Sequence, residues 1–94
     1  MIVARVATFD EAPTLHPDDE RRVASLRDLV RAAPGFIAGY HLREEHTGRL
    51  MSVTIWQSDE AMIKGEEAVR NRPSSDQRGI RPSRIDRWIV DTEF

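Results

Sequence analysis

The side chains best suited to substrate chemistry are concentrated in one predicted β-hairpin. Residues 36–44 and 49–57 are rich in β-branched and aromatic residues, which favour strands. The intervening Glu-His-Thr-Gly at 45–48 is typical of a hairpin turn. A loop of two residues and a loop of four both pair positions of opposite parity, so either loop gives the same division into faces. One face then carries Ile37, Gly39 and Leu50 together with His41, Arg43, Ser52, Thr54 and Trp56.

His41 has the clearest catalytic chemistry of this set. An imidazole with an ordinary pKa of about 6.5 can remove an acidic proton from a substrate near neutral pH. Ser52 and Thr54, expected across from it, would donate hydrogen bonds to a substrate, and Arg43 would favour an anionic form. The alternative is a histidine at the sheet edge that is simply bonded to one of these hydroxyls.

Trp56 is predicted to form a cavity wall or a stacking platform for an aromatic ligand. The alternative is a core aromatic that anchors the junction between a strand and the following helix. The opposite face of the hairpin is almost entirely apolar, with Phe36, Ala38, Tyr40, Leu42, Met51, Val53 and Ile55. We expect Tyr40 and Trp88 to serve packing in the core or at an interface.

The remaining elements have to position this hairpin. A strand is predicted at 2–9, and a helix from Pro17 to about residue 33 carries an apolar stripe of Val23, Leu26, Val30 and Ala33. Pro34 and Gly35 end it. Ser58 is a predicted N-cap for a second helix, whose small residues around Gly65 would either pack closely or roof a cavity. A loop at 73–83 and a strand at 84–92 follow.

The order β-α-β-β-α-β predicts an α+β fold of the ferredoxin-like type, as a single domain over residues 1–94. Its four-stranded antiparallel sheet would carry both helices on one face. The other face holds the apolar set and has no helix to cover it. A second copy of the chain is the simplest cover, so we expect a homodimer.

Composition excludes several classes of function. The net charge of −2 argues against nucleic-acid binding, and no apolar run approaches the length of a membrane span. Cysteine is absent and the three histidines are scattered, so no metal site is expected and a cytoplasmic location is the default. The arginines of the C-terminal third are expected to be solvated charges or partners in ion pairs between subunits.

Two motifs carry a resemblance to a known family. Pro34-Gly35-Phe36 with Gly39-Tyr40 begins the second predicted strand, and Ser52 to Met62 closes the third strand and opens the second helix. Together they resemble the antibiotic-biosynthesis monooxygenase-like family of the dimeric α+β barrel superfamily. The resemblance implies a homodimer in which two sheets face each other and each subunit keeps a cavity between its sheet and its helices. Trp56 matches the tryptophan that often lines that cavity.

The resemblance implies a cofactor-free monooxygenase, or an isomerase, acting on a small aromatic or enolisable substrate of the quinol or anthrone type. Anthrone oxygenases of the family use Asn, Trp and Arg. Here Ser52 and Thr54 replace the Asn, and an Arg in the 78–87 region is available. The haem-degrading branch uses an Asn in strand one and a His in helix two; neither is present, which disfavours that branch. The alternatives are a non-catalytic homodimer that binds a small ligand and a purely structural interaction module.

Overall fold

The computed structural model describes residues 1–10, 17–72 and 81–94 and contains the six predicted elements in the predicted order. The strands are β1 (Val3–Phe9), β2 (Phe36–Arg43), β3 (Leu50–Trp56) and β4 (Arg84–Ile89). The helices are α1 (Pro17–Ala32) and α2 (Asp59–Arg70). The loops predicted around residues 10–16 and 73–83 fall mostly outside the described residues.

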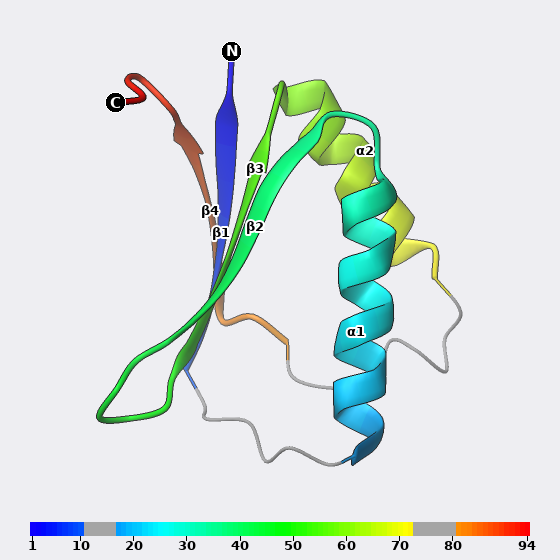
Figure 1. Cartoon of the computed structure of the whole chain (residues 1–94), viewed down its shortest axis with the longest axis vertical. Coiled ribbons are helices and arrows are strands. Elements are labelled where there is room, and N and C mark those ends of the chain that lie inside the picture. Colours follow the sequence, from blue (N-terminus) through cyan, green and yellow to red (C-terminus); the bar gives the residue numbers. More distant parts are fainter. Residues whose placement is uncertain (11–16, 73–80) are drawn as a thin grey trace.

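The four strands form one antiparallel sheet in the order β2-β3-β1-β4. Both helices lie on the same side of it, and no helix of the described residues lies on the other side (Figure 1). The predicted ferredoxin-like α+β fold is therefore confirmed. The apolar side chains gathered on one stripe of α1 and the small residues of α2 explain why both helices cover the same face.

The hairpin between β2 and β3 closes with a four-residue loop. The Glu44 N–H donates to the Arg49 carbonyl over 2.8 Å, and the Gly48 N–H donates to the Glu44 carbonyl over 2.9 Å. Across the strands His41 pairs with Ser52, and Gly39 pairs with Thr54, as the predicted parity requires.

A register shift between Phe36 and Ala38 corrects one part of the prediction. The irregularity places Phe36 opposite Trp56, whereas simple alternation assigned Phe36 to the apolar outer face. The two rings meet edge to face with centroids 5.5 Å apart. A local extra residue in one strand reverses the facing of everything beyond it, which alternation alone does not reveal.

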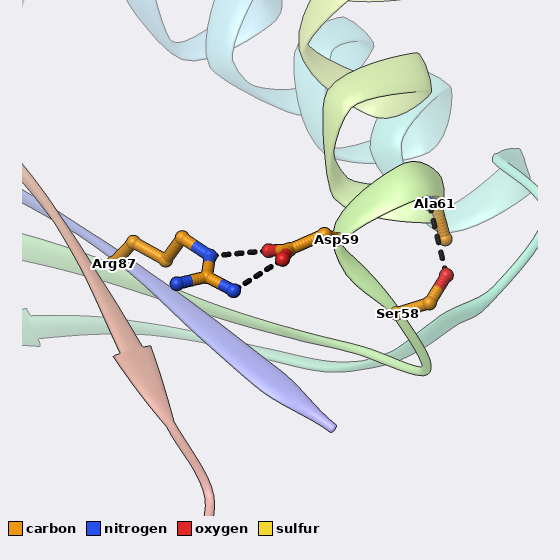
Figure 2. A network of polar contacts seen from close by, with 4 residues as sticks. All are labelled: Ser58, Asp59, Ala61 and Arg87. Atoms are coloured by element: carbon orange, nitrogen blue, oxygen red, sulfur yellow. Dashed lines mark hydrogen bonds and ion pairs between the residues drawn. The ribbon is translucent and has the colours of Figure 1, made fainter. Parts of the chain in front are cut away.

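The start of α2 is fixed by two polar contacts. Ser58 is its N-cap, as predicted, and the Ser58 hydroxyl oxygen accepts a hydrogen bond of 3.1 Å from the Ala61 N–H. The Arg87 guanidinium of β4 makes a two-pronged contact with the Asp59 carboxylate in the first turn (Figure 2). This contact lowers the pKa of Asp59, because the ionised carboxylate accepts both hydrogen bonds. It also ties the helix to an edge strand of the sheet.

The core is small and lies at the end of the sheet near the α2 N-terminus. Val3, Trp56 and Met62 form its buried cluster, and Phe36 and Ala61 pack against it. Gly35 lies at the end of the connection between α1 and β2 with a φ of +85°, a conformation that glycine adopts without strain.

The opposite face of the sheet leaves large apolar side chains in solvent. Tyr40 is 57 % exposed, Leu42 47 % and Trp88 60 %. Asp86 and Arg84 of β4 form an ion pair on the same face. Neither helix in the described ranges has the length and apolar composition needed to cross a membrane.

Candidate functional site

The sheet face beneath the helices is organised in cross-strand rows. Val3, Trp56 and Phe36 form the first row, and Arg5, Thr54 and Gly39 the second. Ala7, Ser52 and His41 form the third, and Phe9, Leu50 and Arg43 the fourth. The first row is packed against α2. The second and third rows therefore carry the polar groups that remain beneath the helices.

A cavity of about 1010 Å³ lies over these middle rows. This volume is at the upper end of the range of about 300–1,000 Å³ that is usual for small-molecule sites. The sheet supplies its floor, and one edge of each helix supplies its roof through Leu26 and Val30 of α1 and Val69 of α2. The predicted cavity between the mixed sheet face and the helices is thus present.

Four of the five site residues predicted from sequence line this cavity. They are His41, Ser52, Thr54 and Trp56. Arg43 is exposed in the fourth row, beyond the residues that line the cavity. The hairpin register brings the four together because they alternate along two paired strands.

Trp56 lies in both of the places considered from the sequence. Its side chain is only 2 % exposed and belongs to the core cluster, and it also forms one wall of the cavity. The indole N–H donates a 2.9 Å hydrogen bond to the Thr54 hydroxyl oxygen. The indole nitrogen is therefore already satisfied, whereas the Thr54 hydroxyl keeps its own hydrogen to donate to a ligand.

His41 lies in the third row at the exposed side of the cavity. Partial removal of solvent lowers the pKa of its imidazole, and the positive charge of Arg27 on α1 lowers that pKa further. Both effects favour the neutral form of the ring. A neutral imidazole is the form that a general base needs.

The site also contains residues that sequence reasoning did not select. Arg5 of β1 lines the cavity floor and approaches Glu66 of α2, with Arg5 Nε 3.5 Å from Glu66 Oε1. An isolated arginine within an otherwise apolar strand was the available signal. Among the arginines available in the 78–87 region, Arg87 is bonded to Asp59.

The comparisons with known proteins agree on the fold. No protein-family model matches the sequence, and no curated protein is significantly similar to it. Among solved structures, the chain is similar to the haem-degrading protein Rv3592 (MhuD) of Mycobacterium tuberculosis, with 25% identity, a TM-score of 0.68 and coverage of 100% of this chain and 99% of that one. Another structure of that protein has two haems in its active site.

Two further matches are to oxygenases. SnoaB, a cofactor-independent oxygenase from Streptomyces nogalater, has 17% identity, a TM-score of 0.72 and coverage of 98% of this chain and 95% of that one. A proposed antibiotic-biosynthesis monooxygenase from Chloroflexus aurantiacus has 9% identity, a TM-score of 0.71 and coverage of 100% and 97%. The chain therefore has the fold of the antibiotic-biosynthesis monooxygenase-like proteins, and the resemblance carried by its two motifs is confirmed.

The side chains of the site do not fit the haem-degrading pattern. The α2 residues that line the cavity are Gly65, Glu66, Val69 and Arg70, none of which supplies an imidazole to iron. The strand-one asparagine of that pattern is also missing from β1. Within residues 1–10, 17–72 and 81–94, no cluster of three or more His, Cys, Asp or Glu side chains could hold a metal ion.

Proposed function

We propose that this protein is a cofactor-free monooxygenase acting on a small aromatic or enolisable substrate bound in the cavity between the sheet and the helices. The observation that carries the proposal is the convergence of His41, two hydroxyl side chains and the Trp56 wall on one cavity. The shared fold with SnoaB, a cofactor-independent oxygenase, supports the reaction class.

The chemistry begins with an acidic C–H bond in the CH2 group of an anthrone-type substrate. His41 takes the proton, and the carbanion is stabilised as its enolate by hydrogen bonds from the Ser52 and Thr54 hydroxyls. Molecular oxygen adds to this carbon and gives a peroxide anion, which recovers the proton from the imidazolium. Loss of water from the hydroperoxide, which takes the second hydrogen of the same carbon and breaks the O–O bond, leaves a carbonyl at that carbon. Both oxygen atoms and all electrons are thereby accounted for.

The working unit of this proposal is a homodimer. The exposed apolar set of Tyr40, Leu42 and Trp88 is continuous with the partly buried Val53 and Ile55 of β3. Apolar faces of this kind are usually covered in solution. Two such sheets packed together would form the dimeric α+β barrel and leave each cavity on the outside of the barrel.

A second candidate is a non-catalytic dimer that binds a small aromatic ligand. The partial exposure of His41 favours it, because a base that is partly open to water gains less from its surroundings than an enclosed one. In this case binding would survive the loss of His41 and no turnover would accompany it.

Oxygen uptake distinguishes the two candidates. The assay uses metal-stripped protein with anthrone and quinol substrates, and compares the His41→Ala variant with His46→Ala as the matched control, because His46 lies in the exposed hairpin turn. The proposal predicts uptake above the spontaneous rate, a loss of about 10²–10⁴-fold in His41→Ala, and an unchanged rate in His46→Ala. Uptake at the background rate in the unsubstituted protein would favour the binding dimer.

A further inference from the structure

The charge of the cavity differs in sign from that of the chain. The whole chain carries a net charge of −2. The described residues that line the cavity nevertheless include Arg5, Arg27, Arg31 and Arg70, with Glu66 as their single carboxylate. Arginines placed around a hollow with low-dielectric walls concentrate positive potential inside it. The cavity therefore attracts anions although the protein as a whole repels them.

Arg5 is the cationic side chain set deepest in this arrangement. It stands in the second row of the floor, paired with Thr54 on β3 and with Arg87 on β4. Its Nε atom is buried and has no hydrogen-bond partner among the described residues. A buried N–H without an acceptor costs about 1–3 kcal/mol, so this group is not satisfied by the residues that the structure describes.

Glu66 neutralises Arg5 only in part. The 3.5 Å separation between Arg5 Nε and Glu66 Oε1 is long for a charge-assisted hydrogen bond, which is usually about 2.7–2.9 Å. The neighbouring Arg87 gives the contrast, since both of its prongs reach Asp59. A guanidinium whose carboxylate partner is this distant can donate hydrogen bonds to a second carboxylate, in the forked geometry that arginine favours.

The rest of the cavity suits a flat apolar body. Phe36 and Trp56 form an aromatic wall at one end, and Leu26, Val30 and Val69 line the roof. Arg5 and His41 are separated by two strand spacings and one two-residue step, so their Cα atoms are about 12 Å apart. A ligand that engages both would therefore present its anionic group and its acidic C–H at different ends.

We propose that the natural ligand is an aromatic carboxylate, and that Arg5 binds its carboxylate on the cavity floor while Arg27 and Arg31 attract it from the α1 side. Glu66 acts as the internal competitor that holds Arg5 when no ligand is bound. The proposal deepens the function proposed above, since it rests on the same cavity, and it names a ligand charge that neither the fold nor a neutral quinol requires.

A pair of probes tests this charge selectivity directly. Naphthalene-2-carboxylate and naphthalene-2-carboxamide have nearly the same shape and differ in charge. Isothermal titration at low salt should show the carboxylate binding at least tenfold more tightly than the amide. Arg5→Gln should weaken carboxylate binding about tenfold or more, as loss of a charge-assisted hydrogen bond implies, and leave amide binding within twofold. Arg49→Gln removes the same charge from the exposed hairpin turn and should change neither.

The Glu66→Gln variant controls for the case in which Arg5→Gln loses binding only because it misfolds. It should tighten carboxylate binding severalfold, because it removes the competing charge, and a gain of this kind cannot come from loss of structure. Equal binding of the two probes, or an equal loss for both in Arg5→Gln, overturns the proposal. So does a Glu66→Gln variant that binds the carboxylate no more tightly than the unsubstituted protein.

The outcomes separate this inference from the proposed reaction. Charge-selective binding without oxygen uptake would retain the carboxylate site and reject the oxygenase. Oxygen uptake with neutral anthrones that is unaffected by Arg5→Gln would retain the oxygenase and reject the carboxylate site.

Discussion

Thr54 connects the core to the cavity through one hydroxyl group. Its oxygen accepts a hydrogen bond from the indole N–H of the buried Trp56, and the same side chain lines the cavity floor. The hydroxyl thus holds the aromatic wall in place and keeps a hydrogen for a ligand. Loss of the Thr54 hydroxyl should therefore affect both the placement of Trp56 and the cavity, even where the shape of the side chain is kept.

Replacement of Thr54 by valine keeps the shape and removes the acceptor. The indole N–H of Trp56 would then be buried without a partner, so we expect a loss of about 1–3 kcal/mol in the free energy of unfolding. Urea denaturation measures it, and Thr54→Ser, which keeps the hydroxyl, should lose much less. Equal stability of Thr54→Val and the unsubstituted protein would contradict the structural role of this hydrogen bond.

The protonation of His41 gives a second prediction at this scale. Desolvation and the Arg27 charge both lower the pKa of His41, so the ring should titrate below its ordinary 6.5. Because the unfolded chain binds this proton at higher pH than the folded one, His41 reduces stability as the pH falls below 6.5. NMR titration of the His41 ring measures the midpoint directly.

Arg27→Gln separates the two causes. It should raise the midpoint of His41 part of the way toward 6.5, since desolvation, the larger cause, remains. Arg49→Gln, in the hairpin turn, serves as the control and should leave the midpoint unchanged. A midpoint at or above 6.5 in the unsubstituted protein would contradict the predicted lowering of the His41 pKa.

At the scale of elements, the position of α2 depends on one glycine. A Cβ atom at position 65 would lie 2.3 Å from Cη2 of Trp56, so the helix backbone touches the indole ring. This contact explains why a residue that weakens helices is found in the middle of α2. The close approach fixes the depth of the roof at the Trp56 end of the cavity.

Gly65→Ala should therefore destabilise the protein although alanine is the better helix former. Overpacking usually costs about 1–3 kcal/mol, against a gain in helix propensity of about 1 kcal/mol, and the clash involves a ring with little room to move. The same substitution in a Trp56→Phe background should become neutral or stabilising. Thermal unfolding of the four proteins completes the cycle, and a destabilisation of equal size in both backgrounds would contradict the proposed contact.

The elements were largely predictable because their signals are local. Alternation along 36–44 and 49–57, the Ser58 cap and the Pro34-Gly35 stop each depend on a few adjacent residues, and the structure confirms them. The register shift beside Phe36 was missed, because nothing in the strand sequence distinguishes an extra residue from a regular one. From the sequence, the small residues around Gly65 could either pack closely or roof a cavity. The position of Trp56 shows that the helix packs closely at Gly65 and roofs the cavity further along.

The site was predictable only where it lies within one hairpin. His41, Ser52, Thr54 and Trp56 share a face by parity alone, whereas Arg5, Arg27 and Glu66 reach the cavity from three other elements. The positions of these three side chains beside the cavity depend on the pairing of β1 with β3 and on the placement of the helices. Arg43 shares the parity of the site but lies beyond the cavity, because parity assigns a face and does not assign a position along it.

At the scale of the whole molecule, the sheet separates two surfaces with different proposed uses. The helix-covered face contains the cavity, and the opposite face exposes Tyr40, Leu42 and Trp88. A chain of 94 residues buries only a modest core by itself. Burial of the second face against another copy would supply the missing apolar contacts.

Tyr40→Glu tests the dimer at that face. Tyr40 is already exposed in the single chain, so a glutamate there should leave the fold intact and place an unpaired charge in the interface. Sedimentation velocity at micromolar concentration should show a species of twice the monomer mass for the unsubstituted protein and a monomer for the variant. A monomeric unsubstituted protein would rule out the barrel dimer.

Binding of an aromatic ligand in the cavity can be followed by a heteronuclear NMR titration of the two tryptophan indole N–H signals. Trp56 lines the cavity and Trp88 stands on the opposite face, so the two signals report the two surfaces, and Trp56→Phe assigns them. With 2-naphthol as the probe, we expect a saturable shift of the Trp56 signal and little change at Trp88. A shift confined to Trp88 would place the aromatic ligand on the other face of the sheet and contradict the proposed site.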